Sequence, residues 1–255
     1  MTRSAQSRAR RARLRLVVAG VVTVAAIAAG GVLVVGAVDG ADPPDQAKAK
    51  PSAAAPGNAA GPSASKPFTP ATGPHVPLLK ATTAAQGIGM GFEGSSLGAL
   101  SAAVSYWQDL DVLDDAIARR QWSAIVSEDS PGTVDRGVSE VRALREGAGL
   151  PPSGGAPDGV TISTVVKAAR AQSLDTTGDV VKVSMVYDRY AVVRDEGADD
   201  NPLRDEVTDL VVKWEGGDWK VSEEPRFTAD RPGPRTYDPD SRFAFDDGWR
   251  MVARG

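Results

Sequence analysis

The amino-acid sequence predicts an α+β domain in which helices pack on a curved antiparallel sheet. Two patterns lead to this prediction. Apolar residues recur at helical spacing between residues 97 and 144, and they alternate with polar residues between residues 181 and 221. A run of helices followed by a run of antiparallel strands is typical of α+β proteins. A third observation places the core of the domain, because all five Trp lie after residue 106.

The N-terminal region predicts a membrane anchor. Residues 1–15 carry six Arg and no acid, and residues 16–38 carry no charge at all. About 20 apolar residues in a helix span the hydrocarbon core, and Arg is enriched on the cytoplasmic side. We therefore expect a single-pass protein of the cell membrane, held in the lipid bilayer by residues 16–38, with a cytoplasmic N-terminus and its C-terminal domain outside. A cleaved signal peptide is the alternative, but the run exceeds a usual signal core of about 7–15 residues.

Residues 39–86 predict a linker. They are rich in Ala, Pro, Gly and Ser and lack apolar periodicity. Such a segment buries too little apolar surface to offset the entropy of ordering. We expect a disordered linker that separates the membrane from an extracytoplasmic α+β domain over residues 87–255. His75, the single His of the chain, lies in this linker and is expected to be solvated.

The first half of the domain predicts helices. Ser95 and Ser96 are good N-cap residues, and the apolar positions that follow recur every three or four residues as far as Val126. A further helix is expected from Pro131, which suits a first helical turn, to Gly147. The apolar residues of these faces are Leu97, Leu100, Val104, Trp107, Leu110, Leu113, Ile117, Trp122, Ile125, Val134, Val138, Val141 and Leu144.

After Gly159 the pattern changes to the alternation of antiparallel strands. We expect the sheet to wrap against the first helix. Burial contributes about 25 cal/mol per Å² of apolar surface, so Trp107, Trp214 and Trp219 are expected to contribute most to the core. The expected order is a strand at 160–174, a turn at 175–178, a strand at 181–193, a polar loop at 195–202, a strand at 208–214, a turn at 216–218 and a strand from Trp219. The irregular tail is expected to close with a short segment around Phe243, Phe245 and Trp249 that packs on the core.

Three segments carry a resemblance to a known family: GMGFEGSSLGALSAAVSYW, VTDLVVKWEGGDWKV and FAFDDGWRMV. With the Arg-rich start, the anchor and the Pro/Ala linker, the chain resembles an extracytoplasmic single-pass membrane protein family of high-GC Gram-positive bacteria. The resemblance implies a nuclear transport factor 2-like cone domain. It also implies a non-catalytic role similar to that of the conjugation and type IV secretion assembly factors.

Charge and composition exclude several classes of function. Because the N-terminus is basic while the net charge is −4, residues 87–255 carry a strong excess of acid. We expect no nucleic-acid binding, since each phosphate contact needs a cation. The chain has no Cys, which excludes thiol catalysis, disulfides and Cys-based zinc sites.

Two motifs suggest ligand chemistry. Gly89, Gly91 and Gly94 match the G-x-G-x-x-G phosphate-binding pattern, but no strand is expected before them and no βαβ unit after them. Hard oxygen ligands for Ca²⁺ are available in an acidic loop, but the D-x-D-x-D-G order is missing. The carboxylates concerned are Asp195, Glu196, Asp199, Asp200, Asp205 and Glu206, with Asp238 and Asp240 as weaker candidates.

The candidates for acid–base catalysis are Tyr106, Tyr187, Tyr190 and Asp188, which an open cone could bring together. The expected domain lacks His, and no G-x-S-x-G motif occurs. The sequence therefore assigns no catalytic, cofactor-binding or metal-binding residues, and we expect neither an enzyme nor a cofactor.

The leading functional expectation is a structural or assembly protein, and the resemblance implies a place in a conjugative or secretion apparatus. Its expected partners are other membrane or cell-envelope proteins or further copies of itself. An extracytoplasmic small-ligand-binding domain and a cone-fold enzyme are the alternatives. A filled cone with apolar surface patches favours the first expectation, and an open pocket lined by Tyr and Asp favours the others.

Overall fold

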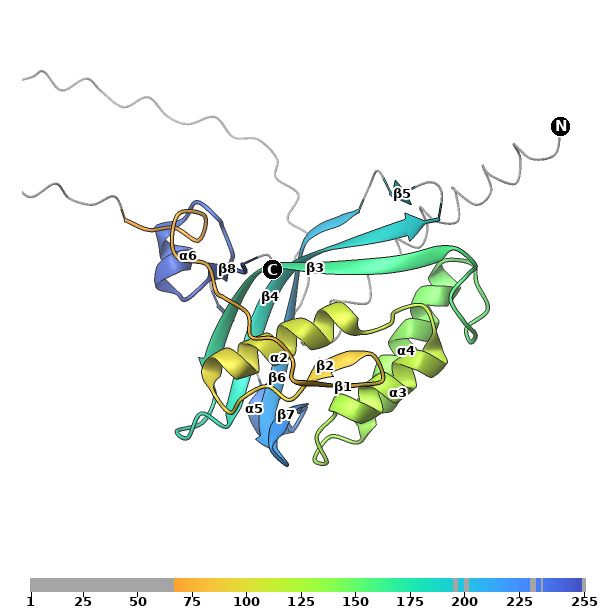
Figure 1. The fold of residues 1–255 in the computed structure, drawn as a ribbon, viewed down its shortest axis with the longest axis horizontal. Helices are drawn as coiled ribbons and strands as arrows, with labels where there is room; N and C mark the ends of the chain where they lie inside the picture. The colour runs from red at the N-terminus through yellow and green to blue at the C-terminus, as the bar shows by residue number, and fades with distance from the viewer. Residues whose placement is uncertain (1–66, 195–196, 200–201, 230–232, 235, 254–255) are drawn as a thin grey trace, which may run out of the picture. The chain divides into compact units, whose positions relative to one another are not determined.

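The computed structural model describes residues 67–194, 197–199, 202–229, 233–234 and 236–253. These residues form an α+β domain in which helices pack on a six-stranded antiparallel sheet, as the sequence predicts (Figure 1). The predicted anchor at 16–38 lies outside the described residues. Within the described part of the chain, no helix combines the length and the apolar character needed to cross a membrane.

Three longer helices follow one another: α2 (Ser96–Asp109), α3 (Asp115–Ile125) and α4 (Gly132–Gly147). Ser95 is the N-cap of α2, as expected, because its hydroxyl accepts a hydrogen bond from the backbone N–H of Gly98. An N-cap side chain of this kind satisfies a backbone donor that has no partner inside the helix.

The continuous apolar pattern from residue 97 to residue 126 is interrupted in the structure. The helix ends at residue 109, and a new helix begins at residue 115. The side chain of Asp111 accepts N–H bonds from Leu113 and Asp114, and Asp114 in turn caps α3 through Ala116 and Ile117. Local side-chain acceptors of this kind compete with helical hydrogen bonds, so the two Asp end one helix and start the next.

The sheet has the strand order β7–β6–β4–β3–β8, with β5 paired to β4. All of its pairings are antiparallel. The three long strands lie side by side in the order in which they follow one another along the chain. The strands are β3 (Val160–Ser173), β4 (Val180–Val193), β5 (Gly197–Ala198), β6 (Leu203–Glu215), β7 (Asp218–Val221) and β8 (Arg250–Met251).

The two faces of the sheet carry different apolar clusters. Val183, Met185 and Tyr187 of β4 join the main core with α2. Val186, which points to the opposite face, packs with Ala168, Ala244 and Trp249. The tail therefore packs on the face of the sheet away from α2. It contains two short helices, α5 (Pro225–Thr228) and α6 (Arg242–Asp246), before β8.

The Trp residues differ from the sequence expectation. Trp219 and Trp249 are each 1 % exposed, whereas Trp107 and Trp214 are partly buried at the edge of the core. Trp214 and Trp219 are cross-strand partners in the β6–β7 hairpin, with ring centroids 5.3 Å apart. Trp214 lies next to the turn, so its ring covers its partner and remains partly open to solvent.

The expected domain boundary at residue 87 does not match the contacts of the preceding segment. Residues 83–85 form β1 (Thr83–Ala85), which pairs with β2 (Ile88–Met90). Val76 forms a parallel bridge with Val252, and Leu79 packs against the core. The apolar residues of this segment are spaced irregularly, which explains why periodicity alone placed it in the linker.

Candidate binding site around Arg189

Arg189 is a buried cation on the face of β4 that packs against the helices. It is 8 % exposed and lies on the same strand face as Tyr187 and Ala191. Tyr187 belongs to the main core, and Ala191 belongs to a second apolar cluster with Leu113 and Leu203. A guanidinium therefore lies between two apolar clusters, where an unpaired charge is costly.

Two neighbouring aromatic rings lie against this guanidinium. Its central carbon is 5.4 Å from the ring centroid of Trp107 and 5.1 Å from that of Tyr187. The two rings meet edge to face, with centroids 5.4 Å apart. Trp107 comes from the last turn of α2. Cation–π contacts of this geometry stabilise a desolvated cation, and they leave its N–H groups free to bind an acceptor.

The polar partners of the cluster are few. The Nε–H of Arg189 donates to Oγ1 of Thr164, its cross-strand partner, at 3.0 Å. No described carboxylate forms an ion pair with Arg189. The Tyr187 hydroxyl and the Trp107 Nε1 are buried and have no hydrogen-bond partner within the described chain. Unsatisfied buried groups are rare in folded proteins and need a reason.

Burial also changes the titration of these groups. It lowers the pKa of Arg189, and the fields of Tyr187 and Glu206 oppose this effect only in part. Burial likewise raises the pKa of Tyr187, which Arg189 opposes. Both shifts have the direction expected for groups removed from water without a close partner of opposite charge.

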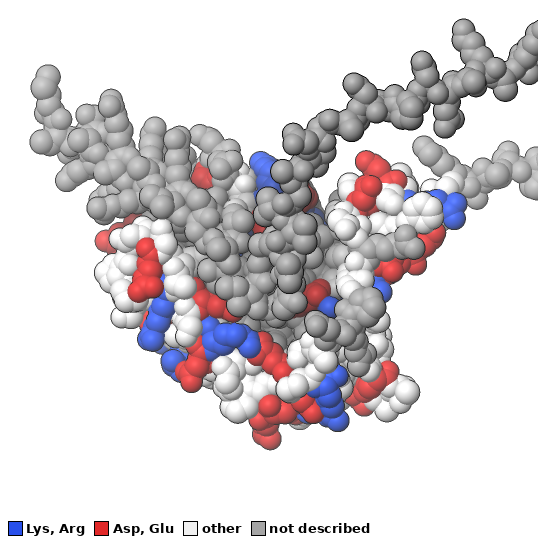
Figure 2. All heavy atoms as spheres, turned by 180° about the vertical axis from the view of Figure 1, so that it is seen from behind, with Lys and Arg blue, Asp and Glu red and all other residues white. Residues whose placement is uncertain are grey.

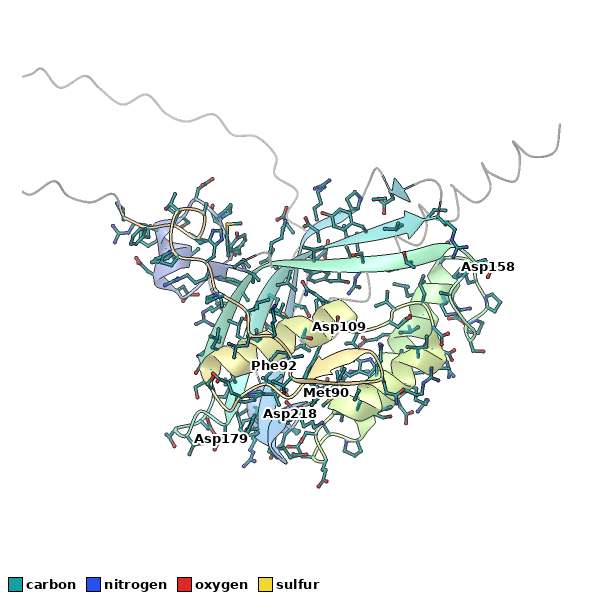
Figure 3. The ribbon with its side chains drawn as sticks, viewed as in Figure 1. Met90, Phe92, Asp109, Asp158, Asp179 and Asp218 are labelled. Carbon is teal, nitrogen blue, oxygen red and sulfur yellow. The ribbon has the colours of Figure 1, made fainter. Side chains whose placement is uncertain are left out.

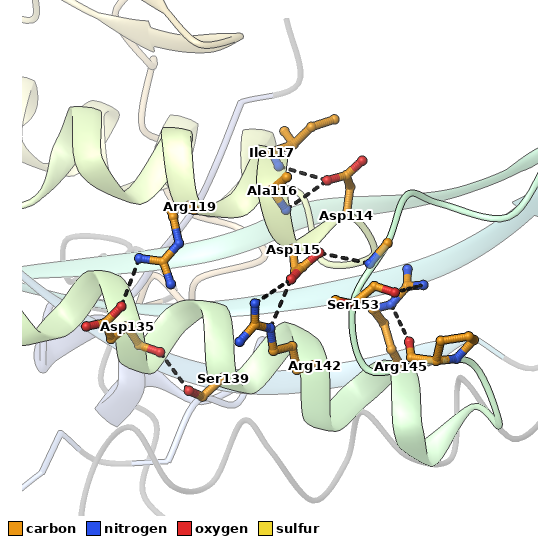
Figure 4. Close-up of polar contacts among 12 residues, drawn as sticks. Asp114, Asp115, Ala116, Ile117, Arg119, Asp135, Ser139, Arg142, Arg145 and Ser153 are labelled. Carbon is orange, nitrogen blue, oxygen red and sulfur yellow. Dashed lines mark hydrogen bonds and ion pairs between the residues drawn. The ribbon is translucent and has the colours of Figure 1, made fainter.

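A second buried arginine, Arg145 of α4, has a different environment. It is 4 % exposed, and its guanidinium donates to the backbone carbonyls of Pro151 and Gly155, at 2.8 Å each, and to that of Leu113. Figure 4 shows this group beside the Asp115–Arg142 ion pair, in which Asp115 also accepts the N–H of Gly154. Arg145 therefore fixes the loop after α4 to the start of α3.

The four acid–base candidates are not brought to one site. The Tyr106 hydroxyl donates to the backbone carbonyl of Trp219 at 2.7 Å, inside the core. Asp188 accepts from Lys167 at 2.7 Å and from the Tyr190 hydroxyl at 3.2 Å, on the other face of β4 from Tyr187. Burial alone would raise the pKa of Asp188, but these bonds outweigh it and lower the pKa.

The glycine motif is part of the β1–β2 hairpin and the turn that follows. The backbone N–H of Gly89 donates to the Asp109 carboxylate at 3.1 Å, and that of Gly91 donates to Asp218 at 2.9 Å. Figure 3 labels both acceptors, Asp109 at the end of α2 and Asp218 at the start of β7. The donors that would hold a phosphate are thus already bonded to carboxylates. A Cβ on Gly94 would lie 3.1 Å from the Trp214 ring, so close packing accounts for this glycine.

The acidic loop and His75 provide no assembled metal site among the residues that the structure describes, since no group of three or more potential ligands converges there. The Asp199 carboxylate accepts the N–H of Ala191, and Asp205 pairs with Lys167. His75 is exposed, on the segment before β1. The remaining acids of the loop, at 195, 196 and 200, lie outside the described residues.

The sequence contains a signal for Arg189 in the alternation of strand β4, although no motif includes this residue. In VVKVSMVYDRYAVV, the inward positions 181, 183, 185 and 187 are apolar or aromatic, and the next inward position is an arginine. A charged residue at an inward-facing position of a strand is unusual and therefore indicates a function. Its aromatic partner Trp107 comes from a distant helix, so only the fold identifies the cluster.

Comparison with known proteins adds no family or structural relative, because no protein-family model, curated protein or solved structure matches this chain significantly. The surface carries mixed charge: Figure 2 shows acidic and basic side chains interspersed over the described residues on that side.

Proposed function

We propose that the chain is a membrane-anchored extracytoplasmic structural or assembly protein whose domain has a nuclear transport factor 2-like cone fold. In this proposal residues 16–38 anchor the protein in the cell membrane, and the domain binds other envelope proteins or further copies of the chain. A role in a conjugative or secretion apparatus follows from the family resemblance. The main apolar core lies between α2 and the sheet, which supports a binding surface over a catalytic cavity there.

Two exposed aromatic side chains carry this proposal. Phe68 is 55 % exposed and Phe243 is 58 % exposed. The Phe68 ring contacts Phe245, which shares α6 with Phe243, at a centroid distance of 5.7 Å. Figure 1 shows the described chain beginning beside α6. Apolar groups gathered at one end of a domain and rimmed by charges are typical of protein-binding surfaces.

The polar groups support a non-catalytic role. Tyr106 and Asp188, two of the four acid–base candidates, are both held by internal hydrogen bonds that stabilise the fold. A general acid or base must reach a substrate proton, and these two groups are occupied by a backbone carbonyl and by a lysine.

The test is purification of the tagged full-length protein from its native membrane, with partners identified by mass spectrometry. A Phe68→Ser/Phe243→Ser variant is expected to lose partners that the wild type retains, while keeping its thermal stability. Val207→Ser is the matched control, because Val207 is 52 % exposed but lies on β6. Equal partner recovery in all three proteins would contradict the proposed surface.

The topology has an independent test. A reporter that is active only outside the cytoplasm, fused after Gly255, is expected to be active because Arg is concentrated before the predicted anchor. Activity of a cytoplasm-specific reporter at the same position would reverse the orientation and remove the extracytoplasmic assignment.

A second candidate function is an extracytoplasmic small-ligand-binding domain. The observation that favours it is the Arg189 cluster, in which a buried cation has no ion-pair partner among the described residues and two buried donors have no described acceptor. A ligand can supply the hydrogen-bond acceptors and the negative charge that the described residues do not. This function is compatible with membrane anchoring and concerns a different part of the domain from the aromatic surface.

A further inference from the structure

We propose that Arg189, Tyr187 and Trp107 form a binding site for the carboxylate group of a small organic acid. This inference rests on the second candidate function and names its residues and ligand class. It does not depend on the assembly role.

The hydrogen-bonding inventory of the cluster defines what the ligand must supply. Arginine has five N–H donors and no acceptor, and one of these, on Nε, is used by Thr164. The Trp107 indole is a donor only, and the Tyr187 hydroxyl can donate as well as accept. The Tyr187 and Trp107 groups are buried without a partner in the described chain. A cluster with a positive charge and more hydrogen-bond donors than acceptors is complementary to a negatively charged group that only accepts hydrogen bonds.

The shape of the cluster favours a carboxylate among such groups. The guanidinium is planar and its N–H groups match the two oxygens of a carboxylate in a bidentate pair. The Trp107 and Tyr187 rings lie against the guanidinium, and the edge that carries its remaining N–H groups has no hydrogen-bond acceptor among the described residues. Thr164 fixes one end of that edge, which pre-organises the remaining N–H groups.

The surroundings favour an acid with an apolar body. The main core reaches the cluster through Val166 and Tyr187, and the second apolar cluster reaches it through Leu203, the β6 partner of Arg189. Apolar walls with a few convergent polar groups are typical of small-molecule sites. A fully hydrated ion would lose its water there without replacement.

Glu206 limits the charge available to the ligand. It is the cross-strand partner of Tyr187, and its field reaches Arg189, but no ion pair joins the two side chains. Asp205 neighbours Glu206 and is paired with Lys167. The site therefore retains an unpaired cation with a partly compensating field, which predicts modest affinity that rises when the Glu206 charge is removed.

The experiment titrates the full-length protein with benzoate, using benzamide as the neutral isostere and inorganic phosphate as a second oxyanion. Binding is measured by calorimetry and by the indole N–H signal of Trp107 in NMR spectra, assigned with Trp107→Phe. Benzoate is expected to bind and to shift that signal, whereas benzamide and phosphate are not. Glu206→Gln is expected to strengthen benzoate binding.

Variants of Arg189 decide the role of the cation. Arg189→Met is expected to weaken benzoate binding about tenfold or more, the effect of losing one charge-assisted pair, and Arg189→Lys to give an intermediate loss. Lys182→Met is the matched control, because Lys182 lies on the opposite face of β4 and pairs with Asp209. It removes one positive charge from the same strand and is expected to leave binding unchanged.

Three results would overturn the proposal: no shift of the Trp107 signal with benzoate, equal binding of benzamide, or unchanged binding in a folded Arg189→Met protein. Binding of phosphate without benzoate would also overturn it. Complementation of a deletion by Arg189→Met separates this inference from the function on which it rests. Full complementation together with lost benzoate binding would support the site and reject ligand binding as the protein's function.

Discussion

Arg145 and Arg189 are both buried arginines, but the chain treats them differently. Arg145 is surrounded by backbone carbonyls that accept its N–H groups, and Arg189 by two aromatic faces and a single hydroxyl. The exposed fractions, 4 % and 8 %, hardly distinguish them. Burial alone therefore does not reveal the role of a charged residue, whereas the balance of its donors and acceptors does.

This difference has a physical meaning. A buried cation whose donors are all accepted contributes to stability, and its loss leaves carbonyls without partners. A buried cation whose donors are not accepted costs stability in the free protein. Such a cost is typical of binding sites, where strain or desolvation is relieved by the ligand.

The largest effect is expected for Arg145→Met. The change leaves the buried carbonyl of Leu113 without its donor and removes the part-buried hydrogen bonds to Pro151 and Gly155. An unpaired buried acceptor costs about 1–3 kcal/mol and each further hydrogen bond contributes about 1 kcal/mol, so the free energy of unfolding should fall by about 3 kcal/mol. Urea unfolding of the full-length protein, followed by Trp fluorescence, measures this value. A loss below about 1 kcal/mol would mean that Arg145 does not have a structural role.

Arg189→Met is expected to have the opposite sign. Replacing an unpaired buried charge with an apolar side chain of similar length is neutral or stabilising, here by about 1 kcal/mol. The same urea experiment measures it, with Lys182→Met as the control for charge removal from β4. A destabilisation as large as that of Arg145→Met would show that Arg189 is a structural residue like Arg145.

The two regions should also respond differently to acid. Hydrogen bonds from Gly154 and Arg142 lower the pKa of Asp115, which lies near Arg145. Its stabilisation is therefore present above the unfolded value of about 3.9 and is lost as the pH falls through the lower folded pKa. Burial raises the pKa of Glu206 near Arg189. Ionised Glu206 thus costs stability near neutral pH, and this cost disappears as the pH falls through its raised folded pKa towards the unfolded value of about 4.3.

The measurement is the urea midpoint as a function of pH for three proteins. Asp115→Asn should remove the acid-side loss, and Glu206→Gln should remove the gain on mild acidification. If both variants kept the wild-type pH profile, neither region would carry the expected linkage.

The smallest effect is expected for Tyr187→Phe. Its hydroxyl has no partner in the described chain, so removing it should change the free energy of unfolding by less than about 0.5 kcal/mol. Tyr106→Phe is the matched comparison, because that hydroxyl donates to the Trp219 carbonyl, and its removal should cost about 1 kcal/mol. Thermal and urea unfolding of both variants check the order. Equal losses would imply an acceptor for Tyr187.

Sequence patterns predict the strands and the N-cap of the first helix because both depend on local spacing. The alternation from Val181 to Tyr187 and the cap at Ser95 are read directly from neighbouring residues. The break between α2 and α3 was missed because the apolar spacing continues through it, while the Asp111 and Asp114 side chains end the helix. Periodicity describes burial and does not describe competition for backbone hydrogen bonds.

The candidate site was harder to predict than the fold. Arg189 occupies an inward position that the alternation makes visible, but its partners Trp107 and Thr164 come from other elements. Trp249 was expected to pack on the core, and it instead covers the outer face of the sheet. Contacts between distant segments depend on strand order and register, which no local pattern contains.

The bridge between Val76 and Val252 has a mechanical consequence. Val76 donates to the Met251 carbonyl and accepts from the N–H of Ala253, so the entering chain is fastened to the end of the domain by two hydrogen bonds. A pull on the chain before residue 68 loads these bonds before it loads the β3–β4–β6 sheet. Release of the segment as far as β1 would add several tens of ångströms of extended chain, at about 3.4 Å per residue, while the sheet stays folded. The entering segment would then yield to tension first and protect the rest of the domain from it.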